Sequence, residues 1–185
     1  MSSIKQLVSH SKIAWYGLLA VCILLLLVLS AVNSKSLATV SIKLREGQQE
    51  HKDKAVPFIT KKGDELPDYM VSYLLGDRWR LIGTAFNQSA SDWIEFKISD
   101  PPNLTLVQGI RVSDEDAVAH DHLEEVQLVD LSPQGKMFHY RIETTRSFKS
   151  GMVWFATTPL GMAIFGAIGL AVFLVVLSHL APALD

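Results

Sequence analysis

The sequence is poor in residues that support covalent or redox chemistry. Its 185 residues include one cysteine, Cys22, so an intramolecular disulfide bond is excluded. Cys22 lies inside an apolar run, where cysteine behaves as a small apolar residue rather than as a nucleophile. A strong charge bias is also missing, because the formal net charge is −2. General nucleic-acid-binding proteins need a basic face, so this balance argues against a nucleic-acid partner.

Recognisable catalytic motifs are absent as well. The sequence contains no glycine-rich phosphate loop, no His-Glu-x-x-His helix and no Gly-x-Ser-x-Gly elbow. Asp114 with His120 or His122 resembles an acid–base pair, but loops rich in both residue types are common. We therefore expect a protein that is not an enzyme.

Charge is missing from two long stretches. Residues 13–32, "IAWYGLLAVCILLLLVLSAV", hold no charged side chain. As a helix that rises about 1.5 Å per residue, this run would span about 30 Å, the thickness of the hydrocarbon core of a bilayer. Residues 150–184 also lack Asp, Glu, Lys and Arg. Aromatic residues suited to the membrane interface begin both runs. We predict an N-terminal tail over 1–12, transmembrane helices over 13–33 and 152–180, a domain over 36–149, and a C-terminal tail over 181–185.

The first apolar run has other interpretations than a transmembrane helix, and the side of the membrane on which the middle domain lies is open. A buried core helix is the simplest alternative for either run, and a cleaved signal peptide is the sharper one for the first, because small residues follow it in "SAVNSKS". Two spans would place both termini on one side of the membrane. Basic residues before the second run favour a cytoplasmic middle domain, although Asn87 and Asn103 stand in glycosylation motifs that would suit a lumenal or periplasmic one.

Between the two runs the apolar residues alternate with polar ones. Short segments rich in β-branched and aromatic residues are separated by turn signals such as Gly76-Asp77 and Ser132-Pro133-Gln134-Gly135. This pattern predicts a mainly β domain, an antiparallel sandwich or small barrel. The expected strands cover 37–44, 69–75, 79–86, 93–98, 104–112, 124–131 and 137–143.

Three of these segments, taken in order, resemble the calcium- and phospholipid-binding sandwich family called C2 domains. They are "KKGDELPDYMVSYLLG", "SASDWIEFKI" and "LTLVQGIRVSDEDAVAHDHLEEVQL". The family has a loop ending in Asp-Pro-Tyr-Val, then a Trp-Asn-Glu-x-Phe strand, then an apolar strand ending in Val-x-Asp-x-Asp. The resemblance covers roughly residues 37–145. It implies an antiparallel C2-like β-sandwich inserted between two transmembrane α-helices.

The resemblance also implies candidate calcium ligands. Calcium takes six to eight oxygen ligands, and carboxylates on adjacent loop tips can converge on it. The candidates are Asp114, Asp116, Asp121, Asp64 and Asp68. The chain departs from the family at Pro67, which replaces the second aspartate of the first loop, and at Lys61, a cation where another ligand is expected.

Other interpretations of the acidic segment, residues 110–128, remain open. The carboxylates form a solvated turn in the simplest one. His120 and His122, two positions apart, are candidate ligands for a transition metal, although no third soft ligand is evident. Either histidine would also suit a pH-sensitive contact, because its charge changes near neutral pH.

Two further sets of residues suggest contacts with the membrane and within it. Three basic residues precede the second apolar run and are candidate contacts for anionic lipid: Arg141, Arg146 and Lys149. A role in orienting the membrane span explains these charges equally well. Small residues in that run would let another helix approach closely, unless they merely reflect the composition of membrane spans. They are Gly161, Ala163, Gly166, Ala167, Gly169 and Ala171.

The sequence therefore predicts a two-pass membrane protein with a membrane-adjacent C2-like domain. We expect it to act as an accessory or scaffold subunit of a membrane protein complex, with the lipid bilayer and other integral membrane subunits as partners. A calcium-responsive phospholipid-binding module is the first alternative. A metal-handling or enzymatic factor is the second.

Overall fold

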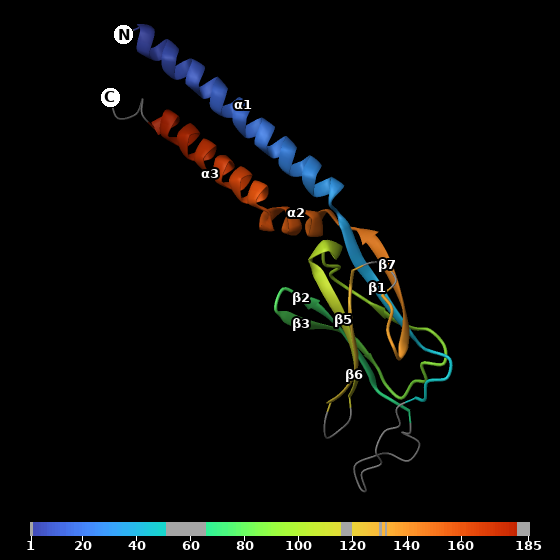
Figure 1. Ribbon diagram of the computed structural model, residues 1–185. Coiled ribbons are helices and arrows are strands. Elements are labelled where there is room, and N and C mark those ends of the chain that lie inside the picture. The colour runs from blue at the N-terminus through green and yellow to red at the C-terminus, as the bar shows by residue number, and fades with distance from the viewer. Residues whose placement is uncertain (1, 51–65, 116–119, 130, 132, 181–185) are drawn as a thin grey trace. The chain divides into compact units, whose positions relative to one another are not determined.

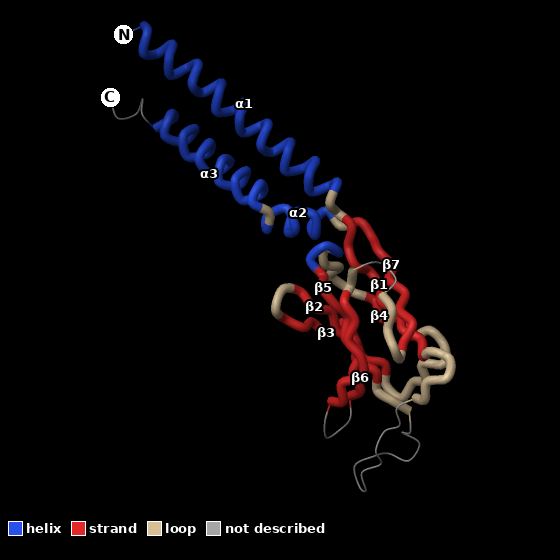
Figure 2. The backbone as a smooth tube through the Cα atoms, viewed as in Figure 1, coloured by secondary structure: helices blue, strands red, loops and turns tan. Residues whose placement is uncertain are grey.

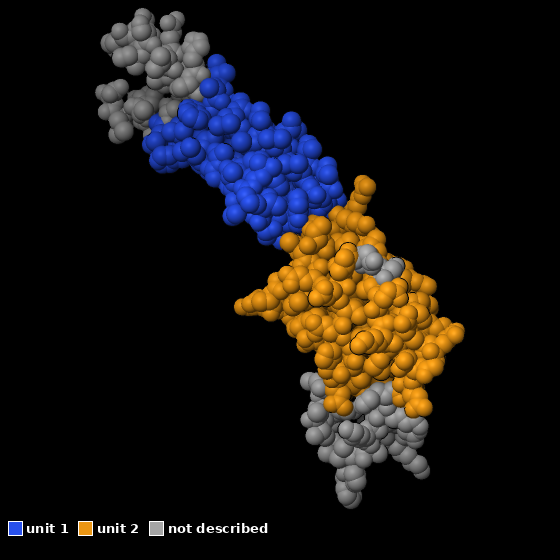
Figure 3. All heavy atoms as spheres, in the orientation of Figure 1, with its two compact units in different colours: residues 1–34, 147–185 blue, residues 35–146 orange. Residues whose placement is uncertain are grey.

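The computed structural model describes residues 2–50, 66–115, 120–129, 131 and 133–180. The chain divides into two compact units, coloured separately in Figure 3. The β unit comprises residues 35–146, and the helical unit comprises residues 1–34 and 147–185.

The described part of the β unit forms two antiparallel sheets in a sandwich-like arrangement (Figures 1 and 2). One sheet has the order β4-β1-β7 and the other the order β3-β2-β5-β6. A short 3-10 helix, η1 (Leu104–Leu106), precedes β5. The strands are β1 (Lys35–Leu44), β2 (Tyr69–Leu75), β3 (Arg78–Ala85), β4 (Ile94–Lys97), β5 (Val107–Glu115), β6 (His120–Gln127) and β7 (Phe138–Arg146).

Alternating apolar residues from both sheets fill one core. In β7 the side chains of Phe138, Tyr140 and Ile142 are buried, while the residues between them are exposed. Val71 in β2 and Phe138 in β7 belong to the same buried cluster. Each fully buried side chain of this size contributes about 1.5–3 kcal/mol relative to an exposed one. The expectation of an antiparallel β-sandwich is confirmed in its sheet arrangement, and the C2 type stays a prediction.

The strands follow the sequence pattern closely, with two informative differences. The segment expected as a strand over 104–112 begins with η1, because the Asn103 side chain accepts a hydrogen bond from the Thr105 N–H at 3.1 Å. The strand expected over 124–131 starts earlier, since the β5–β6 ladder extends to the pair Glu115 and His120. Most of the acidic segment is therefore strand rather than loop.

The helical unit contains two helices that are long and apolar enough to cross a membrane. The apolar part of α1 (Ser2–Val32) covers Ile13–Val32, and that of α3 (Pro159–Leu180) covers Pro159–Leu177. The two helices lie side by side (Figure 1) and share a buried cluster that contains Cys22, Leu26 and Ile164.

The helix expected over 152–180 is divided in two. A separate helix, α2 (Phe148–Thr157), ends at Thr158, whose backbone is extended with φ −84° and ψ 150°. The residue before a proline avoids the helical region, and Pro159 has no N–H to donate to the preceding turn. The Thr158 hydroxyl accepts the Gly161 N–H at 3.0 Å, so it caps the start of α3.

The small residues of α3 do not share one environment. Gly161 and Ala171 are buried and Ala167 is half-buried, whereas Ala163, Gly166 and Gly169 are exposed. A Cβ added at Gly166 or Gly169 would meet no atom within 4 Å, so these two glycines make no close helix contact in the structure.

A close helix approach also involves a glycine outside α3. A Cβ added at Gly151 in α2 would overlap the carbonyl oxygen of Ser30 in α1. The Ser30 hydroxyl is buried there and has no hydrogen-bond partner. Only glycine permits this backbone contact.

Candidate functional site

The β unit has two ends with different chemistry. At the end that we call the connection end, β1 begins and β7 finishes, and Lys35 is the cross-strand partner of Arg146. A bridge between Ser36 and Asn103 places η1 beside this pair. At the opposite end, the loop end, β2 begins and β5 finishes, with Tyr69 opposite Asp114.

Two predicted calcium ligands come together at the loop end. The Asp114 side chain is fully buried, and its carboxylate accepts the Asp68 N–H at 2.9 Å. The Asp68 carboxylate accepts the Asn87 N–H at 2.6 Å. Asp121 lies opposite Asp114 in the neighbouring strand β6. The carboxylates of Asp114 and Asp68 therefore hold the loop backbone against the strand ends.

The remaining candidate metal ligands either lie outside the described residues or are not grouped with Asp68 and Asp114. Asp64 and Asp116 are outside the described residues, as is the side chain of His120. His122 is exposed and lies 4.0 Å from Glu125. Within the described part of the chain, no group of three or more His, Cys, Asp or Glu side chains is placed to hold a metal ion.

Replacing Asp114 by asparagine is expected to destabilise the β unit even without calcium, by about 1–2 kcal/mol. The charged acceptor of the Asp68 N–H is lost in a fully buried position, and hydrogen bonds to charged groups are worth about 1.5–3 kcal/mol. Chemical denaturation in the presence of a chelator measures the change. An unchanged midpoint would show that the carboxylate is not required for the fold.

Two glutamates that the sequence did not single out bind several donors each. Glu124 in β6 accepts the Met137 N–H at 2.9 Å, the Phe138 N–H at 3.1 Å and the Tyr140 hydroxyl at 3.0 Å. It also accepts the Lys136 N–H. This one carboxylate fixes the segment that leads into β7.

Glu50 has the same role at the loop end. Its carboxylate accepts the Tyr69 hydroxyl at 3.2 Å, the Ser89 hydroxyl at 3.0 Å and the Ala90 N–H. It thereby joins the segment after β1 to β2 and to the segment before β4. A sequence of polar residues, "EGQQEHKDKA", gives no sign of which carboxylate does this.

The tyrosines bound to these glutamates are buried and resist ionisation. Burial, followed by the charge of Glu50 and a hydrogen bond to it, raises the pKa of Tyr69 well above its usual value of 10.0. Burial, followed by the charge of Glu124, raises the pKa of Tyr140 in the same direction. At neutral pH both hydroxyls are protonated donors.

Stability of the β unit is expected to fall steeply above pH 10. Because the folded-state pKa values of Tyr69 and Tyr140 are raised, their contribution is complete below the unfolded pKa and is lost as pH rises beyond it. Each tyrosine should lower the free energy of unfolding by about 1.4 kcal/mol per pH unit. Denaturation series at increasing pH, with Tyr140→Phe as control, measure this. An equal slope in the variant would contradict the assignment.

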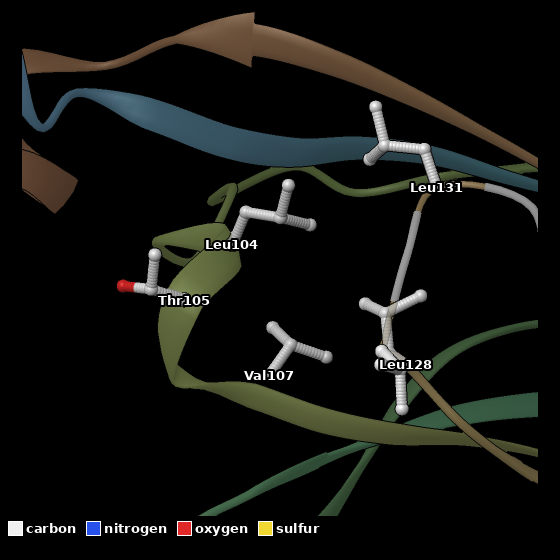
Figure 4. Close-up of a pocket in the computed structure, with 6 residues that line it drawn as sticks. Leu104, Thr105, Val107, Leu128 and Leu131 are labelled. Atoms are coloured by element: carbon white, nitrogen blue, oxygen red, sulfur yellow. The ribbon is translucent and has the colours of Figure 1, made fainter.

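The connection end carries a pocket of about 350 Å³, lined mostly by aliphatic side chains (Figure 4). Leu104 and Thr105 of η1, Val107 of β5, and the segment after β6 surround it. Leu128, Val129 and Leu131 are the lining residues of that segment, and Val129 is 88% exposed. None of the described lining residues is charged, and Asp130, between Val129 and Leu131 in the sequence, lies outside the described residues. The pocket is suited to an aliphatic ligand.

The predicted lipid-contact residues occupy different places. Arg146 ends β7 at the connection end, and Lys149 lies in α2. Arg141 instead stacks over the Trp93 ring, with its guanidinium carbon 4.3 Å from the ring centroid. In the other sheet, Arg111 stacks in the same way over Trp79, at 3.9 Å, and pairs with Glu125 at 2.7 Å.

Known proteins do not identify the chain. No protein-family model matches it, and no curated protein matches it. The two ends of the β unit differ in their geometry. The loop end consists of carboxylates that hold backbone, whereas the connection end combines an open apolar pocket with exposed basic residues.

Proposed function

We propose that the chain is a non-enzymatic, two-pass membrane protein that holds a β-sandwich beside the bilayer as a binding or scaffold subunit. Its partners are the lipid bilayer and other integral membrane proteins. The observation that carries this proposal is the pairing of Lys35 with Arg146. Both covalent connections to the apolar helices leave from one end of the sandwich.

The covalent connections between the strands and the helices are short. Two residues, Asn33 and Ser34, separate α1 from β1, and one residue, Ser147, separates β7 from α2. The Ser147 N–H donates to the Ser34 carbonyl at 2.8 Å, which joins the two connections. An extended chain covers at most about 3.6 Å per residue. These short connections support the proposal that the β-sandwich is held beside the bilayer.

Tags at the two chain ends test the two-pass arrangement. In sealed membrane vesicles, a protease should remove both tags together or spare both, and should show the opposite accessibility for the β unit. Alkaline washing should leave the protein in the membrane. Tags with opposite accessibility would rule out two spans.

Scaffold function predicts association with larger partners. Extracted in mild detergent from its native membrane, the protein should migrate with other subunits rather than at its own mass of 20.5 kDa plus detergent. The same extract treated with a harsh detergent is the control for dissociation. Migration at monomer size under both conditions would contradict the scaffold proposal.

The second candidate is a C2-type module that responds to calcium. Its support is the contact between Asp68 and Asp114, which brings together two of the three segments that carry the resemblance. On this proposal, calcium raises the melting temperature of the wild type, and Asp121→Asn reduces the rise. The absence of any shift at millimolar calcium would remove this candidate.

A further inference from the structure

The short helix α2 has an exposed face that is largely apolar. Gly151 and Phe155 are buried, whereas Phe148 and Val153 are 43% and 52% exposed. Ala156 is exposed as well. At 3.6 residues per turn, these exposed side chains lie on the side of α2 away from its buried residues. An exposed group of apolar side chains indicates contact with an apolar phase or with another molecule.

The contacts of α2 within the helical unit place it at the end of both apolar segments. The apolar part of α1 ends at Val32, and a Cβ added at Gly151 would overlap the carbonyl oxygen of Ser30. On the other side, α2 ends at Thr157 and the apolar part of α3 starts at Pro159. In a membrane that contains α1 and α3, α2 would therefore lie where the hydrocarbon ends.

The corner between α2 and α3 is fixed by the carbonyl oxygen of Phe155. This oxygen accepts the Thr158 N–H at 3.0 Å and the Thr158 hydroxyl at 2.7 Å. A Cβ added at Gly161 would overlap the same oxygen, so the two helices approach closely at this point. The chain changes direction at the corner (Figure 1), which makes α2 a separate element rather than the first turns of α3.

The residue types along α2 suit the boundary between lipid headgroups and acyl chains. Lys149, in the first turn, is the last Asp, Glu, Lys or Arg residue before Asp185. A lysine at the end of an apolar segment extends its ammonium toward the membrane surface while its methylene groups stay among apolar groups. Trp154 is half-buried in the same helix, and tryptophan is enriched at membrane interfaces.

We propose that α2 is an interfacial helix whose exposed face binds bilayer lipid at the boundary between headgroups and acyl chains. Phe148 and Val153 contact the acyl chains at this level, and Lys149 lies at the level of the phosphates. The membrane span itself starts at Pro159.

This proposal rests on the two-pass function above and adds a lipid-binding surface outside the two spans. The occupant is lipid because the exposed face of α2 continues the apolar surfaces of α1 and α3, which that function places in the bilayer. A helix with a polar first turn and an apolar face buries that face to a depth of about 5–10 Å at such a boundary.

Spin labels at three exposed positions test the level of α2. The full-length protein, in a Cys22→Ala background, has one nitroxide-labelled cysteine at a time in place of Val153, Val32 or Leu170. Each protein is placed in phosphatidylcholine nanodiscs. Collision rates with oxygen, which concentrates among acyl chains, and with a water-soluble nickel complex give the depth of each label. Val32 marks the end of the apolar part of α1, and Leu170 is exposed on α3.

The label at position 153 should lie about 5–10 Å below the headgroups and within one helical turn, about 5 Å, of the depth of the label at position 32. At about 1.5 Å per residue from Pro159, the label at position 170 should lie near the middle of the bilayer. This combination supports the interfacial helix.

The other results separate the failure of this proposal from the failure of the two-pass function. Free collision with nickel at position 153, with position 170 protected, would place α2 in water and overturn the lipid surface alone. Protection of position 153 from both reagents would show that protein covers this face, which also overturns it. A label at 153 as deep as the label at 170 would overturn the start of the span at Pro159. Free collision with nickel at position 170 would overturn the two-pass function itself.

Discussion

Replacing Glu124 by alanine is expected to lower the free energy of unfolding of the β unit by about 3 kcal/mol. The substitution removes the acceptor for the N–H groups of Lys136, Met137 and Phe138 and for the Tyr140 hydroxyl. A buried donor left without an acceptor costs about 1–3 kcal/mol, and partial access of water to this half-buried site offsets some of the sum. Chemical denaturation of the full-length protein in detergent gives the global change.

Hydrogen exchange supplies a local measurement for the same variant. The Met137 and Phe138 amides should exchange faster in Glu124→Ala, because their carboxylate acceptor is gone. Amides in the β2–β5 ladder should lose protection from exchange only to the extent that the lower free energy of unfolding explains.

The neighbouring glutamate is a matched control. Glu125→Ala removes a partly exposed ion pair with Arg111, worth about 0.2–1 kcal/mol, and the exposed 4.0 Å contact with His122. Arg111 keeps its stacking contact with Trp79. Glu124→Gln preserves an acceptor oxygen and should have an intermediate effect. Equal destabilisation by the two alanine variants would show that the four donors do not depend on Glu124.

The sequence could not distinguish these two glutamates. Alternation predicts that one of two adjacent residues in a strand faces inward, but the strand register decides which one. In β6 the register against β5 shifts between Val112 and Ser113, so the pattern changes side near Glu124. Such a register shift depends on the partner strand, so it cannot be predicted from the sequence of β6 alone.

The strands themselves were largely predictable. The expected segment 69–75 coincides with β2, and the segments over 37–44 and 137–143 lie within or beside β1 and β7. Each has the alternation of a half-buried strand. The acidic segment was harder, because Asp114 and Asp121 are paired strand residues and their polar composition is typical of a turn.

The helix contacts were predicted only in part, for a related reason. Four-residue spacing identifies a face of a helix but not which face meets a neighbour. Ala167 and Ala171 lie toward the packed side of α3, whereas Gly166 and Gly169 do not. Gly151 stands before the expected span of 152–180, so no search for small residues within that run would find it.

Replacing Gly151 by alanine is expected to destabilise the helical unit by about 1–3 kcal/mol, the usual range for overpacking. The added Cβ would overlap the Ser30 carbonyl oxygen, which is backbone and cannot rotate away as a side chain would. α2 must then move from α1, and the cluster around Phe155, Cys22 and Leu26 loosens with it. The melting temperature of the full-length protein in detergent should fall.

Gly166→Ala and Gly169→Ala are the controls, since alanine there meets no atom within 4 Å. In a helix interior, alanine is favoured over glycine by about 0.5–1 kcal/mol, so both variants should be neutral or slightly more stable. The contrast separates close backbone approach from helix propensity, because all three substitutions add the same methyl group to a helix. If Gly151→Ala were as stable as the two controls, α1 and α2 would not pack closely at Ser30. The contact between these two helices would then not depend on a glycine at position 151.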